Sequence, residues 1–180
     1  CLYAFIQYCD IIDYYTSTPW KKGTMDLSIK ASQLGLRFDN EYCYDLMGKI
    51  VRKANVFGMT VRLDMEDDSL IQDTIDLCLH LNEKYKNVGI AIQANMFRTK
   101  NDIVKLLTKN ISLRLVKGAY KHDISIAYQN QEQIRKMFIQ NAFTILSDRC
   151  RSYYHMRASN TVISAIGTHD QEIIEEIIKN

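Results

Sequence analysis

Residues 114–120 read Arg-Leu-Val-Lys-Gly-Ala-Tyr and combine a strand-like pattern with two positive charges. Strands buried in a parallel sheet are almost purely aliphatic, yet Arg114 lies within this run and Lys117 lies near its end. A buried charge without a partner is very costly, so each cation requires a carboxylate or a bound ligand. The run therefore predicts a binding site at the end of a strand.

Other strand-like segments also end in polar side chains. The residues concerned are Lys30, Asp64, Glu66, Gln93, Lys117 and the triplet Thr168-His169-Asp170. Clustered carboxylates and cations shift one another's ionisation and are typical of functional sites. Because ligands bind at the carboxyl ends of parallel strands, these side chains are expected to line one site.

Five strand-like segments alternate with helix-like segments. The strands are expected at 26–31, 60–65, 89–94, 111–116 and 162–167. The helix after the first strand is indicated by apolar residues at helical spacing, namely Cys43, Leu46, Met47, Ile50, Val51 and Ala54. An amphipathic helix is also expected over Cys1–Ile12. Repeated βα units predict an α/β fold with a parallel sheet covered by helices.

Length and composition narrow the class of protein. The 180 residues are expected to form one domain over 1–180, with 1–24 as a preceding helical segment. A net charge of +2 gives no electrostatic basis for binding nucleic acid. Five cysteines without a CxxC motif indicate free thiols in a reducing compartment. No segment has the length and apolarity of a membrane span, and the histidines lack metal-ligand spacing, so no metal is expected.

Two architectures fit the alternation, an open doubly wound sheet and a (β/α)8 barrel. The first predicts a glycine-rich phosphate loop after an early strand, whereas residues 32–35 read Ser-Gln-Leu-Gly. The barrel predicts polar residues at the ends of many strands, as found here. Alternation also places Arg114 opposite Leu113 and Leu115, which suits a polar interior and an aliphatic exterior. Five strands therefore predict a TIM-type barrel that is incomplete in this chain.

The sequence closely resembles the flavin-dependent proline dehydrogenases in segments that follow the family's order. They read Leu-Ser-Ile-Lys at 27–30, Gln-Leu-Gly-Leu at 33–36, Val-Arg-Leu-Asp-Met-Glu-Asp at 61–67, Ile-Gln-Ala at 92–94, the run at 114–120, and Gly-Thr-His-Asp at 167–170. The resemblance extends from about Met25 to the C-terminus. It implies a distorted (β/α)8 barrel, of which this chain would span the second to sixth strands.

The resemblance implies oxidation of L-proline to 1-pyrroline-5-carboxylate in proline catabolism, with hydride transfer to N5 of non-covalent FAD. In such enzymes the cofactor carries the difficult chemistry and the protein positions and tunes it. By resemblance, Asp64 and Arg114 are catalytic, and Lys30 and Tyr120 bind the substrate. The residues implied to bind FAD are Met65, Gln93, Val116, Lys117, Gly118, Thr168 and His169.

More specific roles follow from the same resemblance. Arg114 would lie beside the flavin ring, Lys30 would face the substrate carboxylate, and Gln93 would hydrogen-bond the ring. Gly118 would let the backbone approach the cofactor closely, and Lys117 would neutralise the pyrophosphate.

Several of these residues also have a purely structural interpretation. Arg114 could form a buried ion pair with Asp64, and Lys30 could extend into solvent from the end of its strand. The triplet at 168–170 is also a normal sequence for a helix N-terminus.

The chain departs from the family pattern in three ways. The family's last helix carries adjacent arginines that clamp the substrate carboxylate, and no Arg-Arg pair occurs here. Asn95 replaces a usual aromatic residue, and His122 replaces a common acidic residue. We therefore expect this chain alone to bind FAD weakly and to oxidise proline poorly. Two alternatives stay open, a Schiff-base aldolase-type barrel using Lys30 or Lys117, and a truncated, non-catalytic pseudoenzyme.

The resemblance also implies partners and a location. The electron acceptor would be of the quinone type. The protein would be located in the cytoplasm, either free or bound peripherally to the inner membrane. The sequence itself indicates no oligomeric state.

Overall fold

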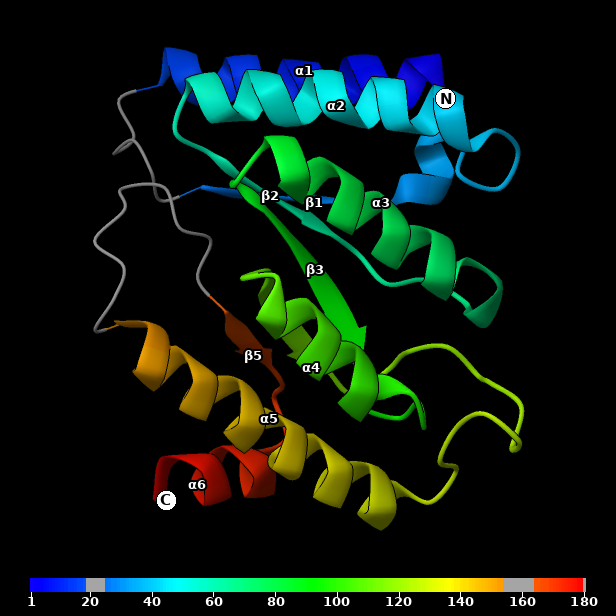
Figure 1. Ribbon diagram of the computed structural model, residues 1–180, viewed down its shortest axis with the longest axis vertical. Coiled ribbons are helices and arrows are strands. Elements are labelled where there is room, and N and C mark those ends of the chain that lie inside the picture. Colours follow the sequence, from blue (N-terminus) through cyan, green and yellow to red (C-terminus); the bar gives the residue numbers. More distant parts are fainter. Residues whose placement is uncertain (19–24, 154–163, 180) are drawn as a thin grey trace. The chain divides into compact units, whose positions relative to one another are not determined.

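A computed structural model describes residues 1–18, 25–153 and 164–179, with the side chains of 148–153 outside the description. The chain divides into two compact units, and the boundary falls between Ile90 and Ala91. Five strands follow one another in the order β1-β2-β3-β4-β5 within one sheet. Strands and helices alternate along the chain (Figure 1), which confirms the predicted α/β class.

The first unit contains a preceding helix, two βα repeats and the start of β3. Its elements are α1 (Leu2–Ser17), β1 (Asp26–Ile29), the short 3-10 helix η1 (Ala31–Leu34), α2 (Asn40–Val56), β2 (Thr60–Leu63), the 3-10 helix η2 (Asp68–Leu70), α3 (Ile71–Lys84) and the start of β3 (Val88–Gln93). Strands β1 and β2 pair in parallel, with Leu27 opposite Val61. Helix α1 lies alongside α2 (Figure 1).

Helix α2 has the apolar face that the sequence predicts. Its buried residues are Cys43, Leu46, Met47, Ile50, Val51 and Ala54. Asp39 caps the N-terminus, since its side chain accepts a hydrogen bond from the Tyr42 N–H at 3.0 Å. Full burial of an aliphatic side chain contributes about 1.5–3 kcal/mol, so this face accounts for much of the packing of the unit.

Helix α1 is confirmed as a helix but buries little. Only Ile12 is buried among its described side chains, whereas Leu2, Tyr3 and Tyr14 are well exposed. The predicted amphipathic pattern therefore corresponds to a narrow contact stripe rather than a broad apolar face.

The second unit contains the rest of β3 and the remaining repeats. Its elements are α4 (Thr99–Thr108), β4 (Ser112–Val116), α5 (Gln131–Tyr153), β5 (Ala165–Gly167) and α6 (Gln171–Lys179). Strands β4 and β5 pair in parallel, with Arg114 opposite Ala165. Residues 162 and 163 of the predicted fifth strand lie outside the described residues.

Burial along β4 follows the alternation that the sequence predicts. Leu113 and Leu115 are buried, whereas Arg114 and Val116 are half-buried. The aliphatic face is therefore the covered one, and the other face carries the charged side chain. Within the described part of the chain, no helix is long and apolar enough to cross a membrane.

Candidate functional site

In the first unit, Asp64 follows β2 and is held against β1. The Ser28 hydroxyl donates to Asp64 Oδ1 at 2.6 Å, and the Asp64 N–H donates to the Ile29 carbonyl at 2.8 Å. Lys30 is exposed at the end of β1, and Met65 is buried. The parallel pairing of β1 and β2 thus brings Lys30 and Asp64 to the same edge of the sheet.

In the second unit, Gln93 ends β3 in a closed environment. Its side chain is buried, and its Oε1 lies 3.4 Å from His122 Nε2. Its carbonyl accepts a hydrogen bond from the Thr99 hydroxyl at the start of α4. Gln93 is therefore fixed by its backbone and approached by His122, one of the two positions where the sequence departs from the family pattern.

Gly118 lies against Asn95, the other position at which the sequence differs from the family pattern. Its backbone has a φ of 109°, a conformation that residues with a Cβ rarely adopt. A Cβ at Gly118 would overlap the side-chain amide of Asn95. The Asn95 N–H donates to the Lys117 carbonyl at 3.1 Å, which holds the two segments together. The fold thus requires glycine here, independently of any approach to a cofactor.

Lys117 belongs to an ion-pair cluster around Asp170. Asp170 Oδ2 accepts from the Lys117 ammonium and, at 3.2 Å, from the Arg135 guanidinium. The hydrogen bond from Lys117, with smaller contributions from the Ile173 N–H and Arg135, lowers the pKa of Asp170 to about 2. The charge of Lys117, which the resemblance assigns to the pyrophosphate, therefore already has a carboxylate partner in the chain.

The Thr-His-Asp triplet forms the N-terminus of α6. Asp170 Oδ1 accepts from the N–H groups of Glu172 at 3.2 Å and Ile173 at 3.4 Å. The Thr168 hydroxyl accepts from the Asp170 N–H at 3.1 Å, and His169 is exposed. The capping interpretation therefore applies to Asp170 and Thr168, and His169 is exposed beside them.

Gly167 on β5 leaves room beside Arg114. A Cβ at Gly167 would lie 3.2 Å from Val116 Cγ1 and 3.8 Å from Arg114 Cγ. Tyr120 is half-buried, with its ring centroid 6.3 Å from that of His122. Arg114, Val116 and Tyr120 therefore all lie in the second unit together with Gln93.

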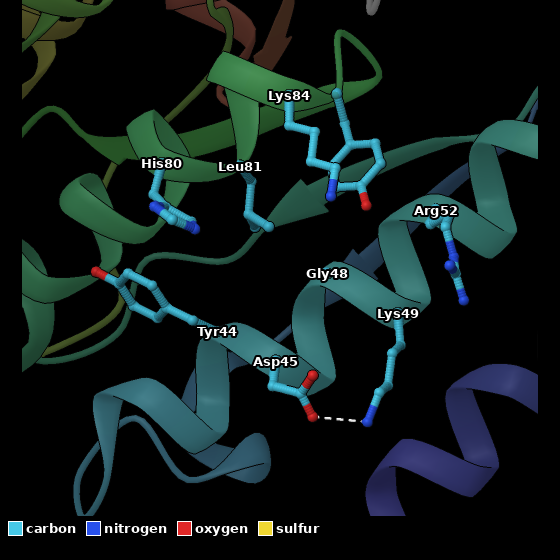
Figure 2. A pocket seen from close by; sticks show the side chains of 9 residues that line it. Tyr44, Asp45, Gly48, Lys49, Arg52, His80, Leu81 and Lys84 are labelled. Carbon is cyan, nitrogen blue, oxygen red and sulfur yellow. Dashed lines mark hydrogen bonds and ion pairs between the residues drawn. The ribbon is translucent and has the colours of Figure 1, made fainter.

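Two cavities occur away from these residues. In the first unit, a cleft of about 300 Å³ lies between α2 and α3, and Figure 2 shows Tyr44 beside His80 at one end and Gly48 on the α2 side. In the second unit, a cavity of about 390 Å³ lies between the segment after β3 and α5. None of the residues predicted to bind substrate or FAD lines either cavity.

Sequence reasoning missed several residues that hold the site. Ser28 fixes the Asp64 carboxylate, and Arg135 joins the Lys117 cluster from α5. Ser28 had a signal, because strand alternation places it on the same face as Lys30. Arg135 had none, since it is one of several cations on a helical surface.

A family model described as Proline dehydrogenase matches residues 3–179. This chain belongs to the proline dehydrogenase family. The match includes every residue to which the resemblance assigned a role, from Lys30 to His169.

Curated relatives agree with this proline dehydrogenase assignment. Proline dehydrogenase 2 of Bacillus subtilis is 32% identical over 149 residues, which are 83% of this chain and 45% of that protein. Proline dehydrogenase of Deinococcus radiodurans is 27% identical over 157 residues, 84% of this chain and 46% of that protein. The chain thus spans about half the length of the curated relatives it matches.

Solved structures give the fold. Proline utilization A (PutA) of Bdellovibrio bacteriovorus, inactivated by N-propargylglycine, has a TM-score of 0.80 at 18% identity, covering 97% of this chain and 22% of that one. PutA of Bradyrhizobium japonicum has a TM-score of 0.81 at 16% identity, covering 98% and 20%. The predicted fold class, an incomplete TIM-type barrel of the proline dehydrogenase kind, is therefore confirmed.

Proposed function

We propose that this chain is part of an enzyme that oxidises L-proline to 1-pyrroline-5-carboxylate, with hydride transfer to FAD. The strongest support is the match of the family model to residues 3–179, which include Lys30, Asp64 and Arg114. Lys30 and Asp64 directly follow β1 and β2, and Arg114 lies within β4. The chemistry of these residues agrees with a zwitterionic substrate, which needs a cation for its carboxylate and an acceptor for its amine.

Lys30 and Asp64 are proposed to bind and orient proline. A lysine ammonium is a compact charge suited to one carboxylate oxygen. Asp64 can only accept hydrogen bonds when ionised, and the hydroxyl of Ser28 at 2.6 Å fixes the direction of one of its oxygens. A fixed acceptor lowers the entropic cost of orienting the substrate.

The residues present fit FAD. Gln93 offers a buried amide, which supplies both donors and an acceptor for a flavin ring. Arg114 supplies positive charge from β4, whereas the Lys117 ammonium is shared with Asp170. The Thr168 hydroxyl lies just before α6. When bound, FAD supplies the acceptor for the hydride removed from proline. Apart from Met65, all residues proposed to bind FAD lie in the second unit.

Arg114 is proposed to stabilise negative charge that develops on the reacting groups. Removing one such electrostatic contact typically lowers turnover by about 10²–10³-fold. We expect Arg114→Ala to lower proline-dependent dye reduction by this order and to lower flavin occupancy or shift the flavin potential. The matched control is Arg52→Ala, since Arg52 is an exposed arginine of α2, and it should leave both properties unchanged.

The competing aldolase hypothesis makes a different prediction. A Schiff-base lysine must attack a carbonyl as the neutral amine, whereas the Lys117 ammonium is engaged by Asp170. Borohydride treatment with a carbonyl substrate should therefore leave Lys117 unmodified, and the proposed function predicts the same for Lys30, which would bind a carboxylate instead of a carbonyl. The proposed function would be refuted if the protein were colourless, reduced no dye with proline and were labelled by borohydride at Lys117 or Lys30.

A quinone-type electron acceptor and a cytoplasmic location, with or without peripheral contact to the inner membrane, belong to the same proposal. The acceptor follows from the family's chemistry, because the electrons removed from proline must finally pass to an acceptor. The location rests on the resemblance to the family alone. Reoxidation of the proline-reduced protein by a soluble quinone, measured against molecular oxygen, tests the acceptor.

A further inference from the structure

The turn that carries Lys30 is bound by side chains from three other segments. Lys30 is the residue before η1, so its backbone position decides where its ammonium can reach. The Lys30 carbonyl accepts from the Gln33 N–H at 3.1 Å, which closes the first turn of η1. A 3-10 turn this short has little stability of its own, and its shape therefore depends on what holds it.

Tyr8 of α1 holds the turn on one side. Its hydroxyl accepts a hydrogen bond from the Lys30 N–H at 3.3 Å and donates one to Gln33 Oε1 at 2.6 Å. The pKa of Tyr8 is raised, mainly by burial. The hydrogen bond from the Lys30 N–H lowers this pKa, and the negative charges of Asp64 and Glu66 add to the increase. The hydroxyl thus keeps the proton that it donates to Gln33.

Glu66, which follows β2, holds the turn from another side. Its side chain is buried, and its two oxygens accept from the Ser32 N–H at 3.0 Å and the Ser32 hydroxyl at 2.5 Å. A buried carboxylate is costly unless it is hydrogen-bonded, and a two-point contact of this kind also fixes geometry. The Glu66–Ser32 contact therefore sets the distance between the β2 end and η1.

Cys43 of α2 completes the clamp. Its thiol lies 3.6 Å from the Ala31 carbonyl as a hydrogen-bond donor, and it is a free cysteine. Burial, aided by the charge of Glu66, raises the pKa of Cys43 to about 12. The thiol is therefore protonated at neutral pH, as donation to a carbonyl requires.

We propose that Tyr8, Cys43 and Glu66 form a clamp whose role is to position Lys30 for the substrate carboxylate. The inference rests on the proposed function, since it assumes that Lys30 binds proline. Consecutive residues from Lys30 to Gln33 are each bound, whereas the Lys30 side chain itself is exposed. The three clamp residues are positioning residues, because they act through Lys30 and not on the substrate.

The test compares KM and kcat for proline in the intact flavoprotein. Tyr8→Phe removes one contact to Lys30, and Glu66→Gln weakens the contact to Ser32. Loss of one ordinary hydrogen bond that positions Lys30 corresponds to an increase in KM of roughly twofold to tenfold, with little change in kcat. Tyr3→Phe is the matched control, since Tyr3 is an exposed tyrosine of the same helix, and its KM should be unchanged.

A combination with Lys30→Ala separates positioning from general stability. Lys30→Ala alone should raise KM by at least about tenfold, the effect of losing a charged contact. Glu66→Gln should raise KM no further in the Lys30→Ala protein if it acts through Lys30. Glu66→Asp, which keeps the carboxylate, should raise KM for proline less than Glu66→Gln does.

The outcomes distinguish this proposal from the proposed function. If Lys30→Ala leaves KM unchanged, the role of Lys30 in the proposed function fails. If Lys30→Ala raises KM while Tyr8→Phe and Glu66→Gln do not, the clamp proposal alone is wrong. If Glu66→Gln raises KM equally with and without Lys30, its effect is structural and the clamp proposal is also overturned.

Discussion

Gly118 illustrates how a single position can be required by the fold as well as by a proposed cofactor. Its φ of 109° and the overlap of a Cβ with Asn95 both oppose any side chain. The backbone strain of a non-glycine residue in such a conformation costs about 1–3 kcal/mol. We expect Gly118→Ala to lower the free energy of unfolding by at least this amount, measured by urea denaturation.

Gly48→Ala is the matched control for this prediction. Gly48 lies inside α2, and a Cβ there would meet nothing within 4 Å. Alanine in a helix interior is about 0.5–1 kcal/mol more favourable than glycine, so this variant should be more stable. Equal effects of the two substitutions would contradict the special conformation of Gly118.

Asp170 gives a pH dependence with a defined sign. Lys117 lowers its pKa from the ordinary value of 3.8 to about 2 in the folded chain. The folded state therefore binds the proton less readily than the unfolded state, so the contribution of Asp170 is present above the unfolded pKa and is lost as pH falls. We expect Asp170→Asn to lower the urea midpoint of unfolding at pH 7. The difference in this midpoint between the variant and the unchanged protein should become smaller between about pH 4 and pH 2.

The control is Asp10→Asn, because Asp10 is an exposed carboxylate of α1. This variant should change the urea midpoint little at either pH, since surface substitutions are usually within about 0.5 kcal/mol. A difference between Asp170→Asn and the unchanged protein that stays constant down to pH 2 would contradict the assigned role of Lys117.

Among the elements, α2 is the one whose ends and buried face depend most clearly on local sequence. Asp39 precedes the helix and accepts from the Tyr42 N–H. Replacing an N-cap carboxylate by alanine typically costs about 1 kcal/mol, whereas serine can still cap. We expect Asp39→Ala to be destabilised by about this amount and Asp39→Ser to be close to the unchanged protein, measured by thermal unfolding.

Single elements were predictable because their periodicity reports which side faces solvent. The buried residues of α2 and the alternation of Leu113, Arg114 and Leu115 on β4 agree with the prediction. The 3-10 helices η1 and η2 were not predicted, since turns this short carry no period. The ends of the first four strands were predicted within two residues, which is the usual uncertainty of element boundaries, whereas β5 begins at Ala165 instead of residue 162.

Contacts between elements could not be predicted from the sequence. Ser28 and Asp64 are 36 residues apart, and Lys117 and Asp170 are 53 apart. Each pair depends on the register between two strands or on the path of a loop, and no local pattern encodes either. For this reason Lys117 was assigned to a pyrophosphate without its partner Asp170, and Glu66 received no role.

At the scale of the whole molecule, the boundary between the two compact units falls inside β3, which extends from Val88 to Gln93. Because this boundary lies within a strand, neither unit can unfold separately without breaking that strand. Domain boundaries that permit independent unfolding normally lie in exposed linkers. The sequence predicts one domain over 1–180, and its cooperativity of unfolding is the property that tests this prediction.

We therefore expect a single cooperative transition, in which a change in one unit shifts the unfolding of both. Asp39→Ala lies in the first unit, yet it should lower the thermal unfolding midpoints of α2 and of α5 in the second unit equally. A loss of about 1 kcal/mol corresponds to a decrease of roughly 2–4 °C in a domain of this size. Hydrogen exchange measured by mass spectrometry on peptides from α2 and α5 provides the two midpoints, and Asp39→Ser is the control that should shift neither. If α2 shifts while α5 keeps its midpoint, the two units unfold independently and β3 does not couple them.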